Sequence, residues 1–271
     1  MIGPRSNGSA TPLKRDMIRL GDIDLELHET GTGAPVLFLH SGQGFVPEQP
    51  FVGMLAKRYR VIAPSHPGFG ASSLPDWVDA VDDIAHLYLE LMDRLDLRRA
   101  KIIGCSIGGW IAAELATKAP ERIEKLVLVG PEGVKTGSPH KLDIPDLYAM
   151  SQEQLAKTMF HDPAKAQMDL SKLSKEQLTV IARNRETLAM LVWEPYMHNP
   201  KLKHRLHRVD MPVLFMRGES DGLVSAEYLA RYAKLVPHGQ IETIAAAGHS
   251  PQVEQPEAFV AVVASFFEQG V

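Results

Sequence analysis

Gly104-Cys-Ser-Ile-Gly108 is the stretch of sequence that decides the fold. It follows the apolar run 101–103 and leads into Trp110-Ile-Ala-Ala113, which begins a helical pattern. A sharp turn from strand to helix would hold Ser106 in a strained backbone conformation, and only small neighbours tolerate such a turn. The hydroxyl would stand above the sheet edge, near the positive end of the helix. This pattern in this context predicts a nucleophile elbow.

Apolar runs on both sides of the elbow predict a mostly parallel sheet. Residues 17–30 indicate two short strands joined at Gly21-Asp22, and further strands are expected at 35–39, 61–63, 101–104, 125–129, 212–216 and 241–244. Helical spacing of apolar residues lies between these runs, for example over 77–95 and after 256. Strands that alternate with helices predict an α/β fold, with helices on both faces of the sheet.

The alternation breaks between 134 and 206, where no strand candidate occurs. Two helix-start patterns, Ser151-Gln-Glu-Gln154 and Ser174-Lys-Glu-Gln177, precede apolar residues at helical spacing. Five of the eleven methionines fall in this region, at positions 150, 159, 168, 190 and 197. We expect a core domain formed by 1–133 and 207–271, with a helical cap inserted at 134–206.

The composition excludes several classes of function. The chain has 271 residues and a net charge of −4, which favours neither nucleic acid nor an anionic membrane as a partner. Its single cysteine, Cys105, rules out an internal disulfide and fits a reducing compartment. No run is apolar enough for a signal peptide or a membrane span. We expect a cytoplasmic protein with a loose N-terminal tail of about ten residues; the oligomeric state stays open.

A serine hydroxyl needs a base, and the base needs an orienting acid. His249 follows the last predicted strand, so it would stand over the carboxyl edge of the sheet. Asp221 follows the strand at 212–216 and is the expected acid, with Glu219 and Glu132 as alternatives.

Two backbone amides should stabilise an oxyanion. The amide of Ile107 is one candidate, and Gly42 in His40-Ser-Gly-Gln-Gly44 is the first choice for the other, with Ser41 the second. No histidines stand at a metal-binding spacing with carboxylates, and no dinucleotide fingerprint or P-loop lysine occurs. We therefore expect neither a metal nor a cofactor.

Five pieces in this order resemble the α/β-hydrolase superfamily along nearly the whole chain. They are Leu39-His-Ser-Gly42, Pro64-Ser-His-Pro-Gly-Phe-Gly-Ala-Ser72, Gly104-Cys-Ser-Ile-Gly-Gly109, Arg217-Gly-Glu-Ser-Asp221 and Gly248-His-Ser-Pro251. The resemblance implies an eight-stranded sheet, with a helical cap after the sixth strand, and a Ser-Asp-His order of the triad. Ser41 and Ser65 depart from the glycine and aspartate that are common in the family.

The resemblance also implies acyl transfer to water. A serine nucleophile argues against the dehalogenases and epoxide hydrolases of this fold, which use aspartate. We expect hydrolysis of small to medium apolar esters; the alternatives are a carbon–carbon bond or amide hydrolase on the same triad and a slow ligand sensor. Many carbon–carbon hydrolases carry tryptophan where this chain has Ser250. The expected substrate pocket includes Ser41, Phe45, Trp193, Tyr196 and Met197.

Overall fold

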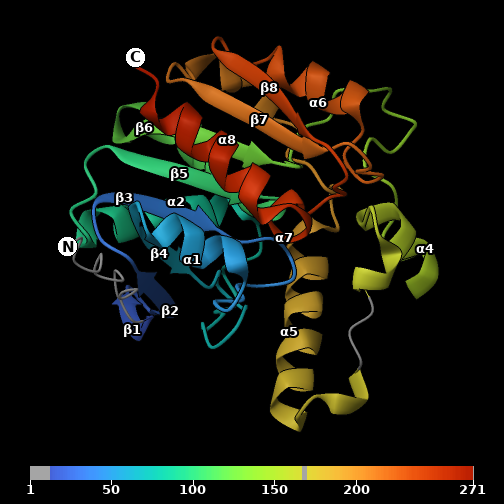
Figure 1. The fold of residues 1–271 in the computed structure, drawn as a ribbon, viewed down its shortest axis with the longest axis horizontal. Helices are drawn as coiled ribbons and strands as arrows, with labels where there is room; N and C mark the ends of the chain where they lie inside the picture. Colours follow the sequence, from blue (N-terminus) through green and yellow to red (C-terminus); the bar gives the residue numbers. More distant parts are fainter. Residues whose placement is uncertain (1–12, 167–169, 271) are drawn as a thin grey trace, which may run out of the picture.

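The computed structural model describes residues 13–166 and 170–270 (Figure 1). The predicted loose tail and Met168 lie outside the described residues. One sheet of eight strands forms the centre, in the spatial order β1 (Lys14–Leu20), β2 (Ile23–Thr30), β4 (Tyr59–Pro64), β3 (Ala34–Leu39), β5 (Ala100–Cys105), β6 (Ile123–Val129), β7 (Val213–Gly218) and β8 (Gly239–Ile244). These strands confirm the predicted α/β class and the predicted strand positions.

The direction of the strands fixes where the functional loops meet. β2 runs antiparallel to both β1 and β4, whereas every neighbouring pair from β4 to β8 is parallel. The carboxyl ends of six strands therefore share one edge of the sheet. The loops that follow β3, β5, β6, β7 and β8 converge at this edge, where ligands bind in open α/β sheets.

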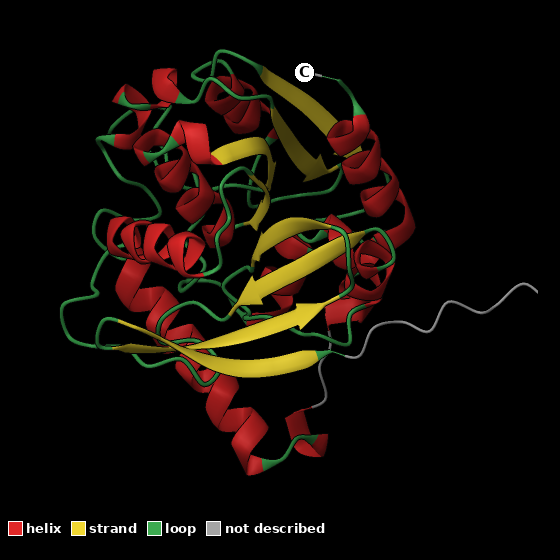
Figure 2. Ribbon diagram, turned by 90° about the vertical axis from the view of Figure 1, so that its left-hand side faces the viewer, coloured by secondary structure: helices red, strands yellow, loops and turns green. Residues whose placement is uncertain are grey.

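Helices cover both faces of the sheet (Figures 1 and 2). On one face, α1 (Pro50–Ala56) and α8 (Pro256–Glu268) pack their apolar side chains against the strands. The opposite face packs against α2 (Val81–Arg94), α3 (Ile107–Lys118) and α6 (Ala226–Ala233). Strands buried from both sides explain why their sequences are continuous apolar runs.

The helix expected over 77–95 begins later, at Val81. The Trp77 side chain is 53% exposed, and its indole nitrogen donates to the Asp22 carboxylate at 3.0 Å. The helix begins where the Asp83 carboxylate accepts the Ala80 amide at 3.1 Å. The predicted helix is too long at its start because Trp77 fits the apolar spacing of the helix. In the structure Trp77 does not pack into the core but is hydrogen-bonded to Asp22.

Between β6 and β7 the described residues form helices and no named strand. α4 (Gln152–Met159) and α5 (Lys175–Val192) begin at Ser151 and Ser174, and each serine accepts a hydrogen bond from the amide three residues later. Short 3-10 helices occupy Pro163–Ala166, Leu170–Lys172, Leu202–His204 and Leu206–Arg208, and α7 (Pro251–Glu254) precedes α8. Both predicted helix starts are confirmed.

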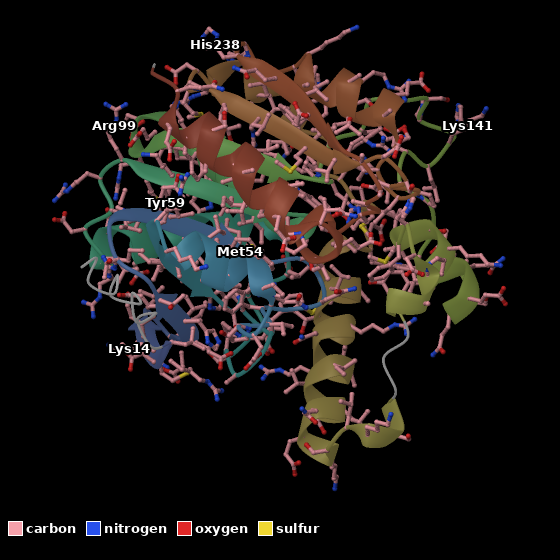
Figure 3. All side chains as sticks on the ribbon, in the orientation of Figure 1. Lys14, Met54, Tyr59, Arg99, Lys141 and His238 are labelled. Atoms are coloured by element: carbon pink, nitrogen blue, oxygen red, sulfur yellow. The ribbon has the colours of Figure 1, made fainter. Side chains whose placement is uncertain are left out.

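The outer half of α5 projects away from the sheet (Figure 2). Residues 174–182 are all exposed, and the side chains in this part of α5 extend outward in Figure 3. No helix in the described ranges is long and apolar enough to cross a membrane.

A buried lysine joins the last helix to the middle of the sheet. Lys125 in β6 is only 2% exposed, and its ammonium donates to the Phe266 carbonyl at 2.8 Å and to the carbonyl of Gln269. These carbonyls lie at the C-terminal end of α8, where a cation is favoured by the helix dipole. The pairing satisfies a buried charge that would otherwise destabilise the fold.

Replacing Lys125 tests this connection. Lys125→Met keeps most of the apolar stem but removes the charged donor, so we expect the free energy of unfolding to fall by about 1–3 kcal/mol. The matched control is Lys203→Met at an exposed position, which should change stability by less than about 0.5 kcal/mol. Urea denaturation of the three proteins measures both values, and equal midpoints for the two variants would contradict the role given to Lys125.

Candidate active site

Ser106 occupies the turn between β5 and α3 in a conformation that few residues adopt. Its φ is +55°, and its amide donates to the Val129 carbonyl at 2.8 Å. A Cβ atom on Gly108 would lie 2.2 Å from the Leu39 carbonyl oxygen, and one on Gly104 would lie 2.4 Å from the Gly108 carbonyl oxygen. Because larger residues would clash at both positions, the two glycines permit the turn that presents Ser106.

His249 and Asp221 meet at the same edge of the sheet. His249 Nδ1 and Asp221 Oδ2 are 3.0 Å apart, and both side chains are buried. The other Asp221 oxygen accepts the amides of Leu223 and Val224, each at 2.9 Å. A proton on Nδ1 shared with Asp221 leaves Nε2 as the nitrogen that can exchange a proton with another group.

The charges around His249 favour its protonated form. Burial acts to lower the pKa of His249, but the charge and hydrogen bond of Asp221 and the charge of Glu132 outweigh it, and the pKa is raised above its ordinary value. An acid–base group of this kind can both accept and return a proton near neutral pH.

The three candidate acids occupy different places. Glu219 is exposed and accepts the Ala246 amide at 3.3 Å. Glu132, which follows β6, is buried, and its Oε1 accepts a hydrogen bond from the Ser106 hydroxyl at 2.8 Å. Only Asp221 among these three hydrogen-bonds His249. Sequence reasoning considered Glu132 as an orienting acid and missed its contact with Ser106.

Two buried polar atoms beside this contact have no hydrogen-bond partner within the described part of the chain. They are Glu132 Oε2 and His249 Nε2. Burial raises the pKa of Glu132 to about 7, against the opposing effects of the His249 charge and the Ser106 hydrogen bond. Ser106 therefore has two proton-exchanging groups near it, one of them already hydrogen-bonded to its hydroxyl.

The two predicted oxyanion donors come from different segments, Ile107 from the elbow and Gly42 from the loop after β3. Ile107 is the first residue of α3, so its amide has no acceptor within the helix. The loop after β3 is shaped at the Ser41 carbonyl, which accepts the Gly44 amide at 2.9 Å and His40 Nδ1 at 2.7 Å. These two contacts shape the loop around Gly42, which is partly buried.

A pair of stacked histidines supports this loop. The His40 and His66 ring centroids are 3.7 Å apart, His40 Nε2 accepts the His66 amide, and His66 Nε2 donates to the His40 carbonyl. Tyr88 hydrogen-bonds His66 Nδ1 from α2. Burial lowers the pKa of His40 to about 4 and lowers that of His66 well below its ordinary value. Both rings are neutral around pH 7, so the loop keeps its shape there.

The segment between β6 and β7 also holds the loops of the site. At the end of α4, the Thr158 carbonyl accepts the Gly222 amide at 2.9 Å, and the Met159 carbonyl accepts the His249 amide at 2.7 Å. The loops that carry Asp221 and His249 are therefore attached to one short helix. Sequence reasoning missed this because carbonyl groups carry no residue-specific signal.

α5 makes a second attachment, on the other side of the site. Asn184 donates to the Gln43 carbonyl at 3.0 Å and accepts the Gly70 amide at 3.1 Å. Thr187 donates to the Gly68 carbonyl at 3.1 Å, and a Cβ on Gly42 would lie 2.5 Å from the Leu188 side chain. α5 thus packs directly against the loop that carries the predicted oxyanion donor.

Two cavities contain four of the five residues predicted for the substrate pocket. Ser41 and Phe45 line a cavity of about 40 Å³, whereas Tyr196 and Met197 line another of about 150 Å³. Trp193 is 58% exposed and packs edge-on against Tyr196. No group of three or more potential metal ligands occurs in the described ranges. The residues that contact substrate stay a prediction.

Comparison with known proteins identifies relatives along most of the chain. A model of the alpha/beta hydrolase family matches residues 36–262. A 2-hydroxy-6-oxo-2,4-heptadienoate hydrolase of Pseudomonas putida is 27% identical, covering 92% of this chain and 95% of that protein. A pimeloyl-[acyl-carrier protein] methyl ester esterase of Photobacterium profundum is 28% identical, and the match covers 88% of this chain and 96% of that protein.

Solved structures share the same fold. A meta-cleavage product hydrolase of Pseudomonas fluorescens IP01 superposes with a TM-score of 0.78 at 22% identity, covering 93% of this chain and 97% of that one. A thermophilic esterase superposes with a TM-score of 0.72 at 20% identity, and the match covers 95% of this chain and 98% of that one. Proteins named as a hydrolase of meta-cleavage products and as an esterase therefore share this fold.

The different positions of the candidate acids lead to a direct test. Asp221→Asn should slow the reaction of Ser106 with a fluorophosphonate by about 10³–10⁴, because the amide cannot hold His249 in the required tautomer. Glu219→Gln, two residues away, should react at the native rate. Stopped-flow labelling measures both, and a larger loss in Glu219→Gln than in Asp221→Asn would contradict the assignment.

Proposed function

This chain belongs to the alpha/beta hydrolase family, and from that premise we propose that it is a serine hydrolase that cleaves small to medium apolar carboxylic esters. The observation that carries the proposal is the buried hydrogen bond between His249 and Asp221, at 3.0 Å, beside a serine held at positive φ. A hydroxyl, an imidazole and an orienting carboxylate are the groups that acyl transfer to water requires.

The reaction would pass through an acyl-enzyme. The Ser106 oxygen bonds to the ester carbonyl carbon and gives up its proton, for which the triad offers His249 as the base. The amides of Ile107 and Gly42 would stabilise the oxyanion. The alcohol leaves with a proton from His249, and water then attacks the acyl-enzyme by the same route. These steps need neither a metal nor a cofactor.

The relatives leave open which bond is cleaved, because they include a hydrolase named for a dienoate and a methyl ester esterase. The position of the Glu132 carboxyl favours an ester over a substrate that carries a carboxylate. It lies 2.8 Å from the Ser106 hydroxyl, so a substrate carboxylate close to the nucleophile would be repelled whenever Glu132 is ionised. Esters with neutral acyl groups avoid this repulsion. Carbon–carbon bond hydrolysis is the second candidate, because relatives with that kind of name align along most of the chain.

The segment 134–206 would act as a cap over this site. Its helices contact the loops of Asp221, His249 and Gly42, which supports a role in shaping the space for the substrate. The partner would be a small molecule, with neither nucleic acid nor membrane required, and a cytoplasmic location fits such a substrate.

Active-site labelling tests the nucleophile. The native chain should be labelled by a fluorophosphonate probe, and Ser106→Ala should lose labelling completely, because among the serines of residues 13–166 and 170–270 only Ser106 lies at an elbow between strand and helix. Labelling that persists in Ser106→Ala would refute the proposal.

A substrate panel tests the bond. Native protein should hydrolyse short p-nitrophenyl and alkyl esters more than 10-fold faster than amides or vinylogous 1,5-diketones of similar size. Faster cleavage of the diketone, with Ser106→Ala inactive, would replace ester hydrolysis by the carbon–carbon reaction.

A further inference from the structure

The carboxyl of Glu254 bridges the loop of His249 and the end of α4. Glu254 is the last residue of α7, and its Oε2 accepts the amide of Gly248, the residue before His249, at 2.6 Å. Its Oε1 accepts the amides of His161 and Asp162, which follow α4, at 3.1 and 3.2 Å. The residue is only 6% exposed. One buried carboxyl therefore supplies acceptors to two segments that are far apart in the sequence.

The loop of His249 has little room to move on this support. A Cβ on Gly248 would lie 2.3 Å from the Met159 carbonyl oxygen, which itself accepts the His249 amide at 2.7 Å. On the other side, Gln255 donates to the Ala246 carbonyl at 2.9 Å. The backbone that carries the imidazole is thus seated directly on the end of α4 and enclosed by α7.

The carboxyl and the amides depend on one another. A buried carboxyl without hydrogen bonds would destabilise the fold, and so would buried amides that lose their acceptor. Amides that donate to a carboxylate also form stronger hydrogen bonds than amides that donate to a neutral carbonyl. Separating the loop of His249 from the end of α4 would therefore break the strongest kind of contact between them.

We propose that Glu254 is a positioning residue that holds His249 in place by fastening its loop to the end of α4. It acts on the reaction through the Gly248 amide and exchanges no proton itself. The segment that would cap the site then takes part in aligning the base as well as in shaping the space for the substrate. The inference rests on the proposed serine hydrolase function, in which His249 is the base.

Glu254→Gln breaks the bridge while keeping the size of the side chain. Glutamine has one acceptor oxygen, and its NH₂ group would face the N–H groups of the other segment. Because a small displacement of a catalytic group is costly, kcat for p-nitrophenyl acetate and the rate of fluorophosphonate labelling should fall by about 10², while KM changes by less than about threefold. The matched control is Glu257→Gln, an exposed carboxyl at the start of α8, which should react like the native protein.

A double variant separates positioning from a general loss of folded protein. Asp221→Asn already releases His249 from its orientation, so adding Glu254→Gln should slow labelling by less than about threefold further. A loss of folded protein would instead lower the rate by the same factor in the native and the Asp221→Asn backgrounds. Stopped-flow labelling of the four proteins measures both factors.

Hydrogen exchange in the native protein tests the bridge without any variant, and it decides the matter if Glu254→Gln does not fold. The amides of Gly248, His161 and Asp162 should be protected and should exchange at similar rates, because opening of the bridge exposes all three. Exchange of Gly248 at the rate of an exposed amide would overturn the inference.

Two labelling results would also overturn it. The first is labelling of Glu254→Gln within about threefold of the native rate, which would leave the proposed function intact. The second is a loss in Glu254→Gln that recurs in full in the Asp221→Asn background. A native chain that is not labelled at all would overturn the proposed function together with this inference.

Discussion

The turn from β5 into α3 is the constraint from which the arrangement of the site follows. Gly104 lets the end of β5 approach Gly108 closely, and Gly108 lets the first turn of α3 lie against the Leu39 and His40 carbonyls at the end of β3. The parallel order of the sheet then brings the loops after β6, β7 and β8 to the same edge. Ser106, Glu132, Asp221 and His249 are neighbours because these four strands end together.

The charges at this edge of the sheet differ from those that hold the loop after β3. The loop is held by neutral histidines, whose low pKa values keep its hydrogen bonds unchanged around pH 7. The site beside it contains two carboxyl groups and one imidazole in a buried space, where a change in one charge alters the others. A support whose own charges do not change next to a titrating centre allows protons to move without displacing the loop that carries the predicted oxyanion donor.

Much of this molecule could be predicted from the sequence, for identifiable reasons. The buried strands appear as apolar runs, and Ser151 and Ser174 show where helices begin because a cap depends on side-chain chemistry. The contact between Ser106 and Glu132 joins residues 26 apart, and no local pattern encodes it. The attachment of α4 uses the carbonyls of Thr158 and Met159, which any residue could supply. Trp77 misled the helix prediction because apolar spacing does not reveal a side-chain hydrogen bond.

The attachment of α5 has a consequence for the substitutions that the neighbouring loops tolerate. Arg183, Asn184 and Thr187 bind main-chain groups of the loops at 43 and 68–72, not their side chains. Side chains at other positions of these loops can change without loss of the hydrogen bonds to α5, whereas a Cβ on Gly44 or Gly68 would lie 2.5 Å from a side-chain atom of the helix. Side chains on either surface can therefore be exchanged one at a time while the hydrogen bonds between α5 and the loop backbone are kept.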